Sequence, residues 1–128
     1  MAKLSDLIKI DKVMPTITIQ GAKIPIHFGF DTLDYVADAY GSSYTIFEHD
    51  FNKLMKQKTV QLNHNAIKLI NALVYGMVRS GGTETTPEEL SRAIGINDIP
   101  DIYDAVTKVF LSENFQNSDA EKIKSDPK

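Results

Sequence analysis

The stretch LNHNAIKLINALVYGMVRSGG, residues 62–82, decides the fold because it holds the longest helical pattern in the chain. Its apolar residues recur three and four positions apart, as side chains on one face of a helix do. That face is broad enough for the centre of a helix bundle, and it comprises Ala66, Ile67, Ile70, Leu73, Val74, Met77 and Val78. Gly81 and Gly82 end the pattern. We therefore expect one long central helix over about 62–80.

Residues 16–30, TITIQGAKIPIHFGF, carry the clearest strand signal. Apolar and polar residues alternate in two runs, and the apolar positions are Ile17 and Ile19, then Ile24, Ile26 and Phe28. A period of two places one face of each strand on a core. Gly21-Ala22 separates the runs and predicts a tight hairpin turn. Pro25 has no amide hydrogen to donate, so it predicts an edge strand. His27 falls on the polar face and is expected to meet solvent.

Two helical patterns lie between the hairpin and the central helix. The first begins at Asp31, a good N-cap residue, and stops at Gly41, which suits the position after a helix end. The second follows Ser42-Ser43 and carries an apolar stripe that runs on to Met55. Both stripes have the spacing of a helix that packs on one side.

Two more helices are expected after the central one. Thr86 caps the first, with Pro87 at its first position and Glu89 completing a capping box, and Gly95 ends it. The second starts near Asp98 or Pro100, and its inner face is lined by Ile99, Ile102, Val106, Val109 and Phe110.

These elements predict a mainly α fold with a small β-hairpin (α+β), in which about five helices pack around one long central helix. Residues 1–15 are expected to form an N-terminal arm or a short helix. Residues 16–115 form a single globular domain, with the hairpin in 16–30 and the helices in 31–115. Residues 116–128 have one large apolar side chain, Ile123, so we expect a mobile polar tail.

The composition narrows the classes of function. The chain has 128 residues and no cysteine, which excludes disulfides and thiolate metal sites. Its net charge of −3 does not favour nucleic-acid binding. The first residues lack an uninterrupted apolar core of signal-peptide length, and no stretch has the roughly 18 apolar residues of a membrane span. We expect a soluble cytoplasmic protein that binds neither nucleic acid nor membrane.

The two helices around Gly95 resemble a helix-turn-helix in outline, so DNA binding has to be weighed. A recognition helix needs cationic or amide side chains to reach bases and phosphates. The segment from 98 to 115 carries four acidic residues against a single lysine, Lys108. Phosphate would be repelled by that segment. Two amphipathic helices joined at a glycine are the better interpretation.

Catalysis has little support in the residues. The three histidines, His27, His49 and His64, show no metal-ligand spacing such as HExxH. No serine lies in a nucleophile-elbow context, and Gly81-Gly82 is not part of a phosphate-binding loop. We therefore expect a protein that is not an enzyme and has no cofactor and no metal.

The aromatic residues allow two interpretations. Tyr44, Phe47, Phe51 and Met55 form a helical stripe, and such a stripe is by default part of a core. Aromatic anchors also dominate binding hot spots, and several amphipathic helices offer more apolar surface than a compact bundle needs. Our binding hypothesis joins this stripe to the exposed hairpin edge at Pro25.

The order of these elements resembles the tail assembly chaperones of siphophages, the long-tailed bacteriophages, and of related prophages. The features that carry the resemblance are TITIQGAKIPIHFGFDTLDYVADAYG, then HNAIKLINALVYGMVRSGG, and finally TPEELSRAIG with IPDIYDAVTKVFLSEN. The resemblance covers about residues 15–115. It rests on the order and spacing of all these segments, since none of them is diagnostic alone.

The resemblance implies a chaperone that binds the tape measure protein and keeps it soluble until the tail tube assembles. It also implies a location in the host bacterial cytoplasm and absence from the mature virion. The tail tube protein and a second copy of the chain are further partners to consider. Two alternatives stay open: a structural tail-completion or connector protein of the virion, and a helix-turn-helix prophage regulator.

Overall fold

The structure, a computed structural model, describes residues 15–57 and 63–125, and it describes side chains through Ser112. Apart from Pro15, the arm predicted for residues 1–15 lies outside the described residues. The described chain is mainly helical with one small hairpin, so the predicted fold class is confirmed. The elements in order are β1 (Thr16–Ile19), β2 (Ala22–Pro25), α2 (Phe30–Tyr40), α3 (Tyr44–Met55), α4 (His64–Ser80), α5 (Pro87–Ala93), the short 3-10 helix η1 (Ile96–Asp98) and α6 (Ile99–Ser125).

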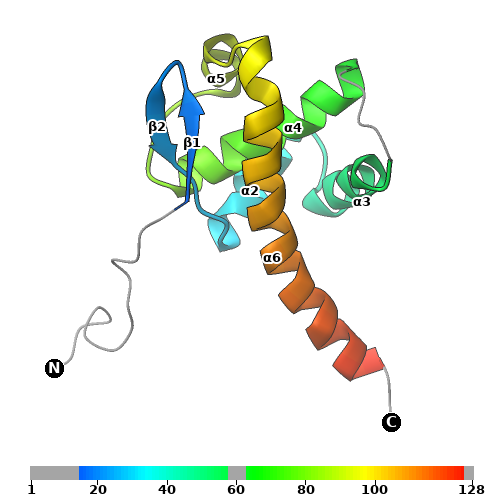
Figure 1. The fold of residues 1–128 in the computed structure, drawn as a ribbon. Helices are drawn as coiled ribbons and strands as arrows, with labels where there is room; N and C mark the ends of the chain where they lie inside the picture. Colours follow the sequence, from blue (N-terminus) through cyan, green and yellow to red (C-terminus); the bar gives the residue numbers. More distant parts are fainter. Residues whose placement is uncertain (1–14, 58–62, 126–128) are drawn as a thin grey trace, which may run out of the picture.

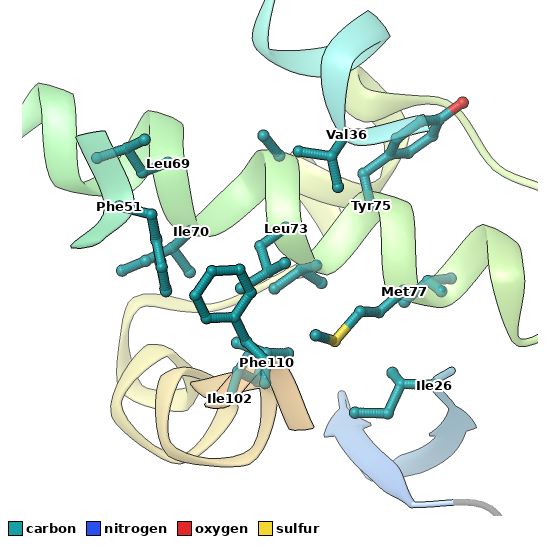
Figure 2. Packing of buried hydrophobic residues seen from close by; sticks show 14 of the residues in the cluster. Ile26, Val36, Phe51, Leu69, Ile70, Leu73, Tyr75, Met77, Ile102 and Phe110 are labelled. Atoms are coloured by element: carbon teal, nitrogen blue, oxygen red, sulfur yellow. The ribbon is translucent and has the colours of Figure 1, made fainter. Parts of the chain in front are cut away.

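Helix α4 forms the centre of the molecule, as its broad apolar face predicted. Every residue from 72 to 78 is buried, so this part of the helix is covered on all sides. Figure 1 shows the hairpin near one end of α4, α3 near the other, and α6 crossing between them. Phe51, Ile102 and Phe110 converge on this central helix in Figure 2. The core is therefore built from helices that all pack on α4.

Helix α2 packs closely on α4 at Gly76, where the absence of a side chain leaves room for it. A Cβ at Gly76 would lie 2.3 Å from Cγ2 of Val36 and 3.1 Å from the carbonyl oxygen of Thr32. No larger side chain fits at that point without displacing one of the two helices.

The hairpin forms where predicted, but its turn is one residue earlier than expected. Ile19 pairs with Ala22, so Gln20 and Gly21 make a two-residue turn. Both have positive φ, 51° and 81°, as a type I′ turn requires. Glycine suits the second turn position, and this preference outweighs the apparent gap at Gly21-Ala22. The alternation survives in β1, where Ile17 and Ile19 are buried and Thr16 and Thr18 are exposed. It is weaker in β2, where Ala22 and Lys23 are both exposed.

The start of α2 differs from the sequence prediction. The helix begins at Phe30 with Gly29 as the N-cap residue, so Asp31 lies inside the first turn. Thr32, which is fully buried, takes the capping role: its hydroxyl accepts a hydrogen bond from the Gly29 amide at 2.8 Å. The same oxygen lies 3.2 Å from the carbonyl oxygen of His27 and 2.6 Å from Ser80 Oγ. A threonine three residues into the helix thus joins α2 to the end of α4.

The cap of α5 is partly as predicted. Thr86 Oγ1 accepts a hydrogen bond from the Glu89 amide at 3.1 Å, and Pro87 occupies the first helical position. The Glu89 carboxylate does not complete a capping box, because it accepts a hydrogen bond from the Thr85 hydroxyl at 2.7 Å instead. The helix ends at Ala93, and its C-cap is Ile94 rather than Gly95.

Helix α6 continues to Ser125, beyond residue 115, where we placed the end of the domain. Its inner face is as expected, since Ile102, Val106 and Phe110 are buried. Asp101 and Asp104 are exposed on the same helix. The mobility predicted for residues 116–128 stays a prediction, and residues 126–128 lie outside the described residues.

Candidate protein-binding surface

The aromatic residues at the middle of α3 lie in the core. Phe47 and Phe51 are both 0% exposed, and their rings stack with centroids 5.5 Å apart. The ring of Phe51 also meets that of Phe110 edge-on at 5.0 Å (Figure 2). The groove hypothesis does not hold for Phe47 and Phe51, because a partner cannot reach them while the fold is intact. Both residues belong to the hydrophobic core, which was the default interpretation of the stripe.

Tyr44 and Met55, at the two ends of the same helix, are half-buried. The Tyr44 ring contacts Phe28 edge-on at 6.5 Å and Phe47 at 5.7 Å. Its hydroxyl is buried and has no hydrogen-bond partner among the described residues. Burial, and to a lesser degree the charge of Glu48, raises the pKa of the Tyr44 phenol. Much of each side chain is therefore committed to the fold, and their role in binding stays a prediction.

Pro25 is the last residue of β2 and is half-buried rather than exposed. The adjacent Ile26 amide donates to the carbonyl oxygen of Pro15 at 2.9 Å. On the other side, a Cβ added to Gly81 would lie only 2.3 Å from the carbonyl oxygen of Pro25. This end of β2 is thus covered by the chain that follows α4. The structure does not bring Pro25 together with the aromatic residues of α3 as one surface, since Phe47 and Phe51 are interior.

The described residues form a different apolar surface, a hollow between the hairpin and α5. Its volume is about 380 Å³. The hairpin, the end of α4 and α5 each contribute apolar side chains, which are Ile19, Ala22, Ile24, Val78, Leu90 and Ala93. Figure 1 shows the hairpin turn, α5 and the start of α6 at the same end of the molecule. We call this feature the hairpin–α5 hollow.

The walls of the hairpin–α5 hollow are held in place by contacts between segments distant in sequence. Ala22 pairs with Ile19 across the strands, so both side chains lie on the same face of the hairpin. Gln20 Nε2 donates to the Ala93 carbonyl oxygen at 3.0 Å and ties the turn to the end of α5. Ile19 is 7% exposed, whereas Ala22 at the rim is exposed. The hollow thus has a fixed apolar floor and an open rim.

The charges at the rim are of one sign. Glu84 and Glu89 line the hollow, and both are exposed. Arg79, five residues before Glu84, is engaged elsewhere: its guanidinium lies 4.7 Å from the centre of the Tyr35 ring. It also donates to the Thr85 carbonyl oxygen at 3.2 Å. In the described part of the chain, no lysine or arginine lines this hollow.

Three other hollows have a more mixed character. The largest, about 470 Å³ between α2, α4 and α5, is lined by basic, acidic and amide side chains that include Lys68, Glu88 and Arg92. One of about 350 Å³ contains Asp50 and Lys53. The third, about 300 Å³, lies where Phe28 and α6 meet. Of the four, the hairpin–α5 hollow has the most apolar walls.

Sequence reasoning missed the hairpin–α5 hollow. Leu90 and Ala93 are three positions apart and so share one face of α5, and the alternation in residues 16–30 placed Ile19 on the inner face of the hairpin. Whether two apolar faces close on each other or leave a gap depends on how the connection 81–86 positions them. The spacing of apolar residues in the sequence does not show how far apart the two faces lie. Ile96, three residues beyond Ala93, is 77% exposed and adds apolar surface near the same end of the molecule.

The three histidines are all exposed, as predicted for His27. In the residues that the structure describes, no group of three or more His, Asp or Glu side chains is placed to hold a metal ion. Over the same residues, no helix is both long enough and apolar enough to cross a membrane.

Comparison with protein-family models, with curated proteins and with solved structures gave no match to this chain. The fold and the surface by themselves define a class, which is a mainly helical domain with a small hairpin and an apolar hollow at its surface. A more specific function is a matter of proposal.

Proposed function

We propose that this protein is a non-enzymatic tail assembly chaperone of a long-tailed bacteriophage or prophage. In this role it binds the tape measure protein in the host cytoplasm and keeps it soluble while the tail assembles. The order of segments that resembles this family supports the proposal. The observation that carries it is the hairpin–α5 hollow, an apolar surface that the molecule's own side chains leave open.

A chaperone of this kind has to cover apolar anchors of a long helical client without demanding a particular sequence. Amphipathic helices bind in apolar grooves through side chains spaced three and four residues apart. The hollow offers walls from Ile24, Leu90 and Ala93 for such anchors. We therefore place the client in the hairpin–α5 hollow, in place of the aromatic stripe on α3.

Co-expression with a tape measure fragment tests the proposal. We expect the fragment to be insoluble alone and to form a soluble complex with the chaperone. In the variant Ala22→Trp, the indole enters the hollow from its rim and should leave most of the fragment insoluble. Thr18→Trp is the matched control, because Thr18 pairs with Lys23 and both are exposed on the opposite face of the hairpin. It should solubilise the fragment as the wild type does.

Two outcomes separate the parts of the proposal. If the wild-type protein leaves the fragment insoluble, the chaperone function is wrong. If Ala22→Trp remains folded by circular dichroism and still solubilises the fragment, the function stands and the client binds elsewhere.

Absence from the mature virion distinguishes a chaperone from a structural tail-completion or connector protein. A connector forms a closed ring of fixed copy number and remains in the particle. Mass spectrometry of purified virions should detect the tape measure protein and not this chain. Its presence in stoichiometric amounts would favour the connector alternative.

A further inference from the structure

We propose that the hairpin–α5 hollow selects one chemical class of client segment, an amphipathic helix whose apolar anchors are flanked by lysine or arginine. This inference rests on the proposed function and specifies the client segment that the chaperone holds. It follows from the charge at the rim, from the closed edge of the hairpin, and from the size of the hollow.

The charge at the rim is acidic, and no described cation opposes it. Glu84 and Glu89 are the charged residues that line the hollow, and both are exposed. In the described residues neither carboxylate has an ion pair with a cation, and the hydrogen bond from Thr85 holds the Glu89 carboxylate in place. A helix with cations beside its anchors complements this rim, whereas an acidic helix is repelled.

The basic residues that are nearest in sequence to the rim of the hollow lie on other surfaces of the molecule. Lys23 is on the opposite face of the hairpin from Ala22 and Ile24, because successive strand residues alternate. Arg92, on the same short helix as Glu89, lines the separate hollow between α2, α4 and α5. Arg79 is held over the Tyr35 and Tyr75 rings. The described chain thus supplies no internal counter-charge at this rim.

The edge of the hairpin disfavours an extended client strand. A strand that adds to a sheet edge needs a continuous row of free amide and carbonyl groups. On β2, Pro25 has no amide hydrogen, and its carbonyl oxygen lies against Gly81. At the other end of the strand, the turn is fixed by the bond between Gln20 and Ala93. Little free edge remains on β2, and α6 packs beside β1, so a helix is the better fit.

The size of the hollow agrees with a helix that inserts only its anchors. A helix with its side chains is about 10 Å across. The hollow of about 380 Å³ is too small for such a rod and suits a few apolar side chains on one face of it. The flanking residues of the same helix then lie at the rim, beside Glu84 and Glu89.

Fluorescence anisotropy with the full chain and labelled synthetic peptides tests this proposal. Each peptide has about 18 residues, enough for a stable helix when bound, with leucines spaced three and four apart. One peptide carries lysines on its remaining faces, and a second carries glutamates. A third matches the lysine peptide but has a central proline, which breaks a helix. We expect binding of the lysine peptide, and weak or no binding of the other two.

The variant Glu84→Gln with Glu89→Gln isolates the rim. Glutamine keeps a side-chain oxygen for the Thr85 hydroxyl while removing both charges. Because the variant removes two exposed charge pairs with the peptide, we expect it to bind the lysine peptide about three- to tenfold more weakly. The matched control is Asp34→Asn with Asp38→Asn, which removes the same charge from exposed positions on α2. It should change affinity less than about twofold.

Three results would overturn the inference. They are equal binding of the glutamate peptide, equal binding of the proline peptide, and a rim variant that loses no more affinity than the α2 control. In each case the co-expression assay still reports on the chaperone function separately. If the wild-type protein solubilises the tape measure fragment but binds the lysine and glutamate peptides equally, the proposed chaperone function stands and the proposed charge selectivity is wrong.

Discussion

Gly76 is the residue on which the packing of α2 against α4 depends most directly. A methyl group there would meet Val36 Cγ2 at 2.3 Å and the Thr32 carbonyl oxygen at 3.1 Å. The first contact involves a side chain packed in the core, and the second involves helix backbone, so neither can yield freely.

We expect Gly76→Ala to lower the free energy of unfolding by about 1–2 kcal/mol, as overpacked core positions do, despite the higher helix propensity of alanine. Urea denaturation measures this change. Gly95→Ala is the control, because the nearest heavy atom to its Cβ is Asp98 Oδ2 at 3.8 Å and its φ of −80° suits alanine. A Gly76→Ala protein as stable as the wild type would mean that α2 and α4 are further apart than described.

Single residues also show why the binding hypothesis had to change. A helical stripe such as Tyr44 to Met55 has the same spacing whether it faces a core or a partner. The structure decides the matter through Phe110, a residue about 60 positions away, whose ring covers Phe51. A double change of Phe47 and Phe51 to aspartate would disrupt the core and cannot serve as a test of binding.

At the scale of elements, the helices were largely predictable because each carries its own signal. The helix over about 62–80 is found at His64–Ser80, and the pattern after Ser42-Ser43 is found at Tyr44–Met55. The predictions that were wrong concern details set by contacts between elements. Thr32 replaces Asp31 at the start of α2 because Ser80 and the His27 carbonyl lie close to its hydroxyl, and no local pattern reports that.

Helices α2 and α3 are joined by a hydrogen bond from the Tyr40 hydroxyl to the Asp50 carboxylate. Burial, followed by this hydrogen bond and the Asp50 charge, raises the pKa of Tyr40 from 10.0 to about 12. The folded protein therefore holds this proton more tightly than the unfolded chain does. The resulting stabilisation is present in full below pH 10.0 and is lost as the pH rises toward about 12.

We expect the melting temperature of the wild-type protein to fall more steeply over that alkaline range than that of Tyr40→Phe, which has no phenol to titrate at this position. Thermal melts by circular dichroism across the range measure the difference. Other tyrosines remain in both proteins, so the comparison isolates Tyr40. Identical slopes for the two proteins would show that folding does not raise the pKa of Tyr40.

At the scale of the whole molecule, the arrangement of charge and apolar surface separates the candidate functions. The second helix of the apparent helix-turn-helix buries Ile102, Val106 and Phe110 against the core and exposes Asp101 and Asp104. Exposed carboxylates on this helix would repel phosphate, and the expectation that the protein does not bind nucleic acid stays a prediction. The fold class followed from composition and periodicity. The hairpin–α5 hollow did not, because its walls come from three segments that only the folded chain brings together.

The central claim is that the client occupies the hairpin–α5 hollow, and site-specific photo-crosslinking tests it most directly. A photoreactive phenylalanine analogue is placed at position 84, an exposed position at the rim of the hollow, or, as control, at position 18, and the protein is irradiated after co-expression with the tape measure fragment. We predict a crosslinked complex from position 84 and little or none from position 18, because Thr18 lies on the face of the hairpin opposite to Ile19 and Ala22. Crosslinking from position 18 alone, or from neither position in a soluble complex, would contradict the claim.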